Sequence, residues 1–222
     1  KMAVLYRSHF HALELQLELT RRNIPFSITS GIRFFEQAHV KDVTAYLKFV
    51  VNPRDEVSFK RIAQLMPGIG PKGADKLWRA FAAERGAEAA GQAEHKTPIA
   101  TALQAVSKSV SRKAAVPWAQ FAATIAQLEE AAPSASAGTL MNIVIEAGYE
   151  DYLHAKYENA PSRLEDLEQL GVFSEQFESL QDFLTQLALL TNVDAEDTGG
   201  RQEEEERLRL SSIHQAKGLE FD

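Results

Sequence analysis

The sequence predicts a mainly α-helical protein with a small α/β part. Short apolar runs that suit β-strands lie near the two ends of the chain, at residues 3–6, 26–29 and 208–213. Between the second and third runs, apolar residues recur at three- and four-residue spacings, which is typical of amphipathic helices. The chain is therefore predicted to be an α/β unit that a long helical segment interrupts.

The N-terminal region is predicted to form a β-α-β unit. Ala3 to Tyr6 is long enough for a strand and too short for a helix. Leu13 to Leu19 alternates apolar and polar residues, which favours a strand. Because this stretch consists of strong helix formers without β-branched residues, we nevertheless predict a helix. Pro25 ends that helix, and Phe26 to Thr29 supplies the second strand.

The helical segment is divided by proline and glycine. An amphipathic helix is predicted from Val40 to Val50, and Phe34 and Phe35 before it are predicted to be core residues rather than a base-stacking platform. Further helices are predicted at 99–110, 118–131, 140–147 and 176–190, with breaks at Pro117, Pro133, Gly148 and Pro161. Residues 82–94 are predicted to be a loop or a frayed helix end, and residues 194–206 to be mobile.

The stretch from Leu65 to Leu77, L-M-P-G-I-G-P-K-G-A-D-K-L, predicts a helix, a tight turn and a second helix that starts near Pro71. Glycines on both sides of a buried isoleucine allow a sharp turn and a close approach of backbone amides to a ligand. Amides at a helix N-terminus suit phosphate, so the pattern indicates a helix-hairpin-helix-like element that grips the duplex backbone; a plain helix–helix turn is the alternative. The predicted duplex contacts are Gly68, Ile69, Gly70, Lys72 and Lys76.

The charge distribution agrees with this hypothesis better than the total charge does. The chain has a formal net charge of −7, which by itself argues against a nucleic-acid partner. Residues 59–85, however, contain six basic and two acidic side chains, whereas residues 146–187 contain two basic and ten acidic ones. The hairpin region is therefore expected to meet phosphate, and the second region to avoid it.

The last strand delivers polar residues to its carboxyl end, where ligands bind in open α/β sheets. The apolar alternation of Leu208 and Leu210 leads into Ile213, and a turn containing His214, Lys217 and Glu220 follows. The alternative is a loop histidine beside a solvated lysine–glutamate pair.

Composition limits the kinds of site and the cellular location that the protein can have. At 222 residues and 45% hydrophobic content the chain can bury a sizeable core. The absence of cysteine excludes disulfides and thiolate metal sites, and no metal site is predicted. No apolar run is long enough to span a membrane and no signal peptide is evident, so we expect a cytoplasmic protein without a membrane partner. The first residues, Lys1 and Met2, and the end at Asp222 indicate a piece of a longer polypeptide.

Two motifs carry a resemblance to a known family. The run S-I-H-Q-A-K-G-L-E-F at residues 212–221 closely resembles motif V of the superfamily 1 DNA helicases of the UvrD/Rep/PcrA type. V-L-Y-R-S at residues 4–8 and N-I-P-F at residues 23–26 resemble the motif IVa region of the same helicases. The resemblance implies a partial RecA-like domain 2A at residues 1–33, a helical 2B insertion at residues 34–197 that contains the hairpin, and a return into 2A at residues 198–222.

The resemblance also implies roles for individual residues. Arg7, His214 and Lys217 match positions that hold or support single-stranded DNA, and Glu220 matches the position that faces the nucleotide. His9 stands where the family usually has an asparagine; an imidazole can donate to phosphate but cannot copy the paired donor and acceptor of an amide. The residue before G-I-G is usually basic in the family, and Pro67 holds that place here.

The function implied for the parent protein is ATP- and Mg²⁺-dependent 3′–5′ unwinding of DNA in replication or repair. Its partners would be single-stranded and duplex DNA, together with repair or replication proteins that bind 2B. No G-x-x-x-x-G-K-[ST] phosphate loop occurs in the chain, so the piece alone is expected to be inactive and to bind no cofactor. The alternatives are a non-catalytic module for DNA binding or partner docking, and the motor arm of a helicase-nuclease.

Overall fold

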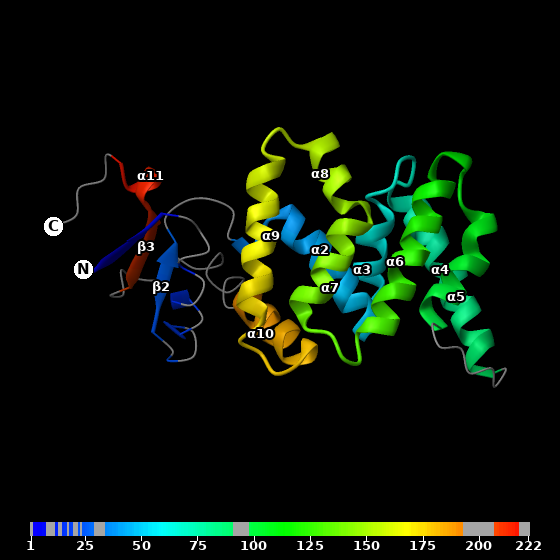
Figure 1. Ribbon diagram of the computed structural model, residues 1–222, viewed down its shortest axis with the longest axis horizontal. Coiled ribbons are helices and arrows are strands. Elements are labelled where there is room, and N and C mark those ends of the chain that lie inside the picture. Colours follow the sequence, from blue (N-terminus) through cyan, green and yellow to red (C-terminus); the bar gives the residue numbers. More distant parts are fainter. Residues whose placement is uncertain are drawn as a thin grey trace. The chain divides into compact units, whose positions relative to one another are not determined.

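The structure of the protein is a computed structural model, which describes residues 2–7, 12, 15–16, 18–19, 22, 24–28, 34–90, 98–192 and 207–217 (Figure 1). The chain forms two compact units. The first unit comprises Lys1–Lys41 and Asp182–Asp222, and the second comprises Asp42–Gln181. The boundaries predicted for domains 2A and 2B, at 33/34 and 197/198, remain predictions.

The first unit contains a parallel sheet of β1 (Ala3–Tyr6), β3 (Leu208–Ser212) and β2 (Phe26–Ile28), in that order. The strand from the far end of the chain therefore lies between the two N-terminal strands. Leu210, on this central strand, is fully buried in a core with Tyr6, Ala12 and Leu19. Residues 15, 16, 18 and 19 are helical, so helix propensity prevailed over the two-residue alternation there.

The end of β3 differs from the prediction. The strand stops at Ser212, and Ile213–Ala216 form the short helix α11 instead of continuing the strand into a turn. Ser212 is a residue type that favours the start of a helix, and the residues that follow Ile213 have no preference for strand. The predicted mobile stretch at residues 194–206 lies outside the described residues.

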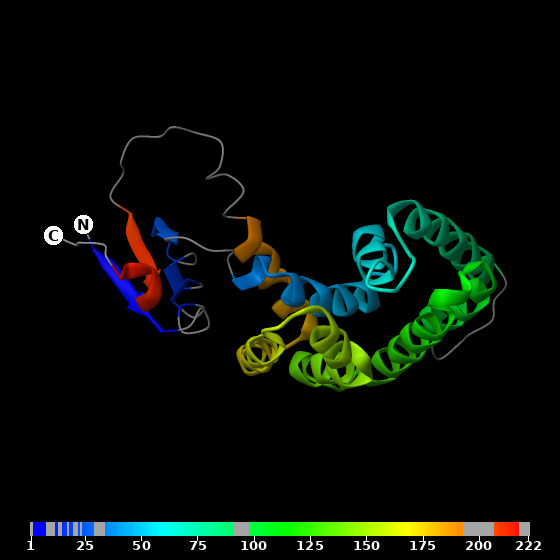
Figure 2. The same ribbon diagram turned by 90° about the horizontal axis from the view of Figure 1, so that it is seen from above.

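Most of the other described residues are in helices (Figures 1 and 2). The α-helices are α2 (Ala38–Val51), α3 (Glu56–Ala63), α4 (Pro71–Ala90), α5 (Pro98–Val106), α6 (Ala115–Ala131), α7 (Ala137–Val144), α8 (Glu150–Lys156), α9 (Ala160–Ser174) and α10 (Leu180–Asn192). Short 3₁₀ turns occur at η2 (Phe34–Glu36), η3 (Ser107–Ser109) and η4 (Arg112–Ala114), and a π turn, η5 (Ile145–Tyr149), joins α7 to α8. Within the second unit, α3, α4, α5, α6 and α7 pack in succession, and α9 packs on α7 and α8.

Two predicted helix breaks were wrong, and one helix extends further than the loop alternative allowed. Of residues 82–94, predicted to be a loop or a frayed helix end, residues 82–90 form the end of α4, because an alanine-rich stretch has high helix propensity, and residues 91–94 lie outside the described residues. Pro161 does not interrupt a helix but lies in the first turn of α9, where the missing amide hydrogen removes no helical hydrogen bond. Pro117 likewise lies in the first turn of α6. The predicted break at Gly148 is confirmed, since its φ of 119° interrupts the helix between α7 and α8.

Aromatic side chains fill the core of the second unit. Phe59 is fully buried and packs against Phe49, Phe81 and Trp118, with ring centroids 5.6, 5.3 and 6.1 Å away. The Trp118 indole donates a hydrogen bond to the carbonyl oxygen of Leu103 at 2.9 Å, which satisfies its buried polar atom. Phe34 and Phe35 in the first unit are also buried, in agreement with their prediction as core residues.

A buried polar cluster ties α2, α3 and η5 together. The Asp42 carboxylate, 3% exposed, accepts hydrogen bonds from Arg61 Nε and from the Tyr149 hydroxyl, both at 2.7 Å. Burial, followed by the nearby Asp42 charge, raises the pKa of Tyr149, so that its hydroxyl remains a donor. Tyr149 also stacks on Tyr152 with ring centroids 5.5 Å apart, which is a packing role.

None of the described helices is both long and apolar enough to cross a membrane. Among the described residues, no group of three or more histidine, aspartate or glutamate side chains is arranged to hold a metal ion.

Candidate nucleic-acid interface

The predicted hairpin has the local geometry that its sequence requires. The chain leaves α3 at Ala63, turns through residues 64–70 and enters α4 at Pro71. Gly68 has a φ of +80°, a conformation that a side chain disfavours. The Ile69 side chain is buried, and its amide donates to the Met66 carbonyl oxygen at 3.2 Å. The buried side chain of Ile69 and this hydrogen bond therefore stabilise the turn.

The two glycines of the turn have different roles. Only Gly68 requires a left-handed backbone. A methyl group added at Gly70 would meet no atom within 4 Å, and its φ lies outside the left-handed region, so the backbone there does not require glycine. Of the two features that the glycine pair predicts, the turn depends on Gly68, and the room for close approach is found at Gly70. The open side of Gly70 is a place where a ligand can approach the backbone closely.

Lys72 and Lys76, the predicted basic contacts, are both exposed on the first turns of α4. The amides of Lys72 and Gly73 lie in the first helical turn, where α-helix geometry supplies no acceptor from within the helix. Positive side chains and the positive end of a helix dipole are thus next to each other at this turn, a combination that attracts anions.

Ion pairs neutralise two of the bases counted in this region. Lys60 pairs with Glu56 at 2.5 Å and with Asp75, and Arg61 pairs with Asp42 at 2.7 Å. The hydrogen bond from Lys60 is the main cause of the lowered pKa of Asp75. The hydrogen bonds that Lys60 donates to Asp75 and Glu56 raise the pKa of Lys60. The hairpin therefore offers fewer cations to a ligand than the sequence count indicated.

The described single-strand candidates follow the ends of two neighbouring strands in the first unit. Tyr6 and Ser212 are register partners at the ends of the parallel strands β1 and β3. Arg7, which is exposed, follows β1 directly, and α11, which contains His214, follows β3. Lys217 is exposed at the end of α11. The side chain of His214 and all of His9 and Glu220 lie outside the described residues.

The structure thus places the candidates in two groups, a sheet edge in the first unit and a hairpin turn in the second. Comparison with known proteins identifies the family. The family model of the UvrD-like helicase C-terminal domain matches residues 1–222 of the chain. The chain belongs to this family. The resemblance to UvrD- and PcrA-type helicases predicted from the two motifs is therefore confirmed.

Curated relatives of this UvrD-like domain are helicases. The ATP-dependent DNA helicase PcrA of Bacillus subtilis (strain 168) is 31% identical over 235 residues, covering 99% of this chain and 30% of the relative. A protein of the same name from Staphylococcus epidermidis is 27% identical over 233 residues, covering 100% and 30%. The one from Leuconostoc citreum is 26% identical over 234 residues, covering 99% and 29%. The UvrD-like domain therefore spans about 30% of the length of these relatives.

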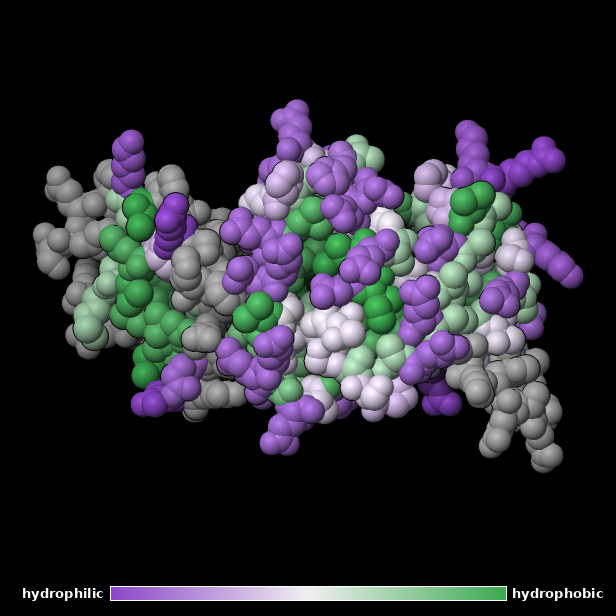
Figure 3. All heavy atoms as spheres, viewed as in Figure 1, coloured by the Kyte–Doolittle hydropathy of each residue, from purple (hydrophilic) through white to green (hydrophobic). Residues whose placement is uncertain are grey.

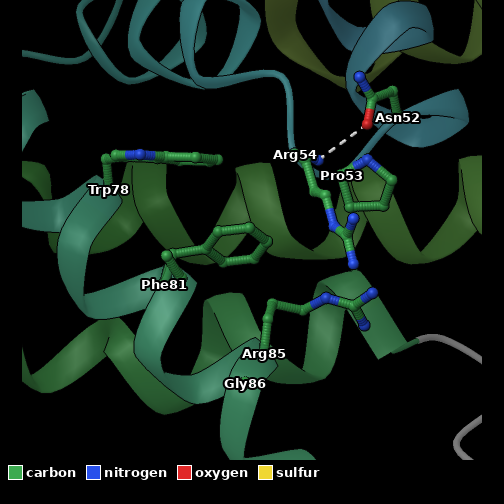
Figure 4. Close-up of a pocket in the computed structure, with 8 residues that line it drawn as sticks. Asn52, Pro53, Arg54, Trp78, Phe81, Arg85 and Gly86 are labelled. Atoms are coloured by element: carbon green, nitrogen blue, oxygen red, sulfur yellow. Dashed lines mark hydrogen bonds between the residues drawn. The ribbon is translucent and has the colours of Figure 1, made fainter. Parts of the chain in front are cut away.

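The UvrD-like domain also contains a pocket to which the sequence analysis assigned no role. It has a volume of about 530 Å³ and is lined by Asn52, Pro53, Arg54, Trp78, Phe81, Ala82, Arg85 and Gly86 (Figure 4). Figure 4 shows Trp78, Phe81 and Arg85 projecting from α4, and the Arg54 amide donates to Asn52 Oδ1 at 3.1 Å. The spacing of 78, 81 and 85 on one helical face is the signal by which the sequence could have indicated this pocket.

Proposed function

We propose that this chain is the part of an ATP-dependent DNA helicase that grips duplex DNA and supplies a portion of its single-strand track. The family match over the whole chain and the PcrA relatives support a helicase parent. The observation that carries the duplex role is the exposed turn at Gly70, where an open backbone position precedes a helix N-terminus flanked by Lys72 and Lys76. Such a turn can seat a phosphate without reading a base.

In this proposal the second unit is a 2B-type insertion whose α3–turn–α4 segment is a helix-hairpin-helix element. Gly68 permits the turn, the buried Ile69 fixes it, and Gly70 leaves room for the phosphate. Lys72 and Lys76 add charge beside the amides. Because these contacts involve the backbone of the duplex only, binding should be independent of sequence and strongly dependent on salt.

The sheet edge of the first unit serves the single strand in the same proposal. Arg7, His9, His214 and Lys217 would contact or support the strand, and Glu220 would face the nucleotide in the complete enzyme. The proposed parent moves 3′ to 5′ using ATP and Mg²⁺ in the cytoplasm, in replication or repair. The present chain has no phosphate-loop motif and is expected not to hydrolyse ATP by itself.

The test is a valine at Gly70. Gly70→Val adds a side chain that meets no protein atom within 4 Å at its Cβ, but it blocks close approach to the turn. Loss of a charge-assisted hydrogen bond predicts roughly tenfold weaker binding to a duplex with a 3′ tail. Binding to a bare single strand should change little. The measurement is fluorescence anisotropy across a salt series, with circular dichroism to confirm folding.

A lysine variant provides the companion measurement. Lys72→Ala should lower the slope of log affinity against log salt by about one if the side chain neutralises a phosphate. Unchanged duplex binding by both well-folded variants would mean that the turn is only a structural corner, and the duplex role would be withdrawn.

A further inference from the structure

The turn between α5 and α6, residues 107–114, lies directly against the hairpin turn. A methyl group added at Gly68 would be 3.8 Å from Ser111 Oγ and 3.9 Å from the Cβ of Lys113. Since α5 packs along α4, the end of α5 lies beside the beginning of α4, and Figure 1 shows both turns at the same end of this unit. Residues about 40 positions apart in the sequence therefore form one continuous surface.

The second turn is basic and contains no acid. Its exposed cations are Lys108, Arg112 and Lys113, and Figure 3 shows hydrophilic side chains projecting from this end of the unit. No aspartate or glutamate occurs anywhere between His95 and Leu128. The next acid with a defined contact, Glu129, lies at the opposite end of α5, where its carboxylate accepts the amides of Ile99 and Ala100 at 2.8 and 2.9 Å. Among the described residues, no ion pair involves Lys108, Arg112 or Lys113, whereas carboxylates neutralise Lys60 and Arg61.

The backbone of this turn is fixed while its basic side chains face solvent. Val106 and Ala114 are buried on either side of it. Within it, the Val110 amide donates to the Ser107 carbonyl oxygen at 3.1 Å, and the Ala114 amide donates to the Ser111 carbonyl oxygen at 3.0 Å. A rigid segment that displays cations loses little backbone freedom when it binds an anion.

Helix stability does not explain the position of two of these cations. Lys108 follows the C-terminus of α5, where a positive charge is favourable. Arg112 and Lys113 immediately precede α6, where the helix dipole disfavours positive charge. A phosphate at this place would interact favourably with the helix end and with both side chains. Ser111 makes no side-chain capping hydrogen bond there and offers a hydroxyl donor.

We propose that residues 107–113 are a second binding site for the sugar–phosphate backbone of duplex DNA, adjacent to the hairpin turn. The inference rests on the proposed duplex role and extends it from one turn to two. Lys108, Arg112 and Lys113 bind phosphates of the same duplex that Gly70 and Lys72 contact, so the helical unit holds the duplex at two neighbouring points. Contacts of this kind position the duplex and carry no sequence preference.

The experiment compares three variants of the 222-residue chain by salt titration of anisotropy, with tailed duplex and with single strand. In Lys108→Ala/Arg112→Ala/Lys113→Ala, alanine keeps the Lys113 Cβ that packs on Gly68, so the hairpin retains its support. Its salt slope on duplex should fall by about two to three, at about 0.9 for each phosphate, and binding at 0.1 M salt should weaken by tenfold or more. A Lys108→Gln/Arg112→Gln/Lys113→Gln variant, which keeps more of each side chain's length, replaces the alanine variant if circular dichroism shows that the latter is unfolded.

Two controls separate the possible outcomes. Arg54→Ala removes an exposed arginine near the pocket, beside the half of α4 that lies farther from the hairpin, and should leave the slope unchanged. Lys72→Ala tests the hairpin itself. If Lys72→Ala lowers the salt slope but the triple variant does not, the second site is refuted and the proposed function stands. If neither Lys72→Ala nor the triple variant lowers the slope, the second site and the proposed duplex role are both refuted. If the triple variant weakens single-strand binding as much as duplex binding, the assignment to duplex is overturned.

Discussion

At the scale of single residues, the hairpin is distinguished by how its charges are paired. Asp75 lies on α4 close to Lys72, Lys76 and Arg79, and it accepts the ammonium group of Lys60. The pKa of Asp75 is lowered, mainly by that hydrogen bond, so the carboxylate stays charged throughout the neutral range. A permanent negative charge beside a phosphate-binding turn opposes binding.

Removing that charge should strengthen duplex binding. In Asp75→Asn the α4 surface gains one unit of positive charge, while Lys60 keeps its pair with Glu56. We expect the salt slope to rise by up to about one and duplex affinity to increase several-fold at low salt. Anisotropy titration measures both quantities. Glu130→Gln, which changes the total charge equally at the far end of α6, is the matched control and should have little effect. Equal gains in the two variants would mean that total charge, not the hairpin, governs binding.

Sequence counting overestimated the basic character of the hairpin for a physical reason. Two of the acids that neutralise Lys60 and Arg61 lie before the counted stretch: Glu56 pairs with Lys60 one turn away on α3, and Asp42 reaches Arg61 from α2. Conversely, Lys113 reaches the hairpin from a later turn. Helix geometry and tertiary contacts decide which charges face one another, so a linear charge count cannot give the distribution of charge on the surface.

At the scale of secondary-structure elements, Asp42 is the point at which three segments meet. It lies on α2, its Arg61 partner on α3 and its Tyr149 partner in η5. Replacing it with alanine would leave a guanidinium and a buried hydroxyl without their shared acceptor.

Asp42→Ala should therefore destabilise the second unit. Breaking a fully buried pair costs about 3 to 5 kcal/mol, and we expect about 2 to 3 kcal/mol here because the Arg61 side chain is 35% exposed. Tyr149→Phe removes a single hydrogen bond and should cost about 1 kcal/mol. Urea unfolding followed by circular dichroism gives both values. If the two variants had equal effects, the Arg61–Asp42 pair would contribute nothing beyond the tyrosine contact.

The elements themselves were largely predictable, whereas their pairing was not. Apolar spacing located β1, β2 and most helices, and Pro71 marked the start of α4. The order β1-β3-β2 depends on contacts between opposite ends of the chain, which local patterns do not encode. The motifs also located the hairpin turn and the edge that follows β1 and β3. They could not show that Gly68 has a positive φ while Gly70 has open space beside it, because both features depend on the folded backbone and its surroundings.

At the scale of the whole molecule, each unit has a hydrophobic core of its own. Phe59 is fully buried among aromatic rings in the second unit, and Leu210 is fully buried on the central strand of the first. Because Phe59 and Leu210 belong to different units, substitutions at these two positions are expected to have independent effects.

Differential scanning calorimetry of the 222-residue chain should therefore show two transitions that can be shifted one at a time. Phe59→Ala leaves a cavity among the aromatic rings and should cost about 3 to 5 kcal/mol, lowering the transition of the second unit by roughly 10 °C. Leu210→Ala should cost about 2 to 5 kcal/mol and lower only the transition of the first unit. If either substitution moved both transitions together, the chain would unfold as one cooperative body. The helical unit could then not be treated as an independent duplex-binding element, because any change at the sheet would alter it.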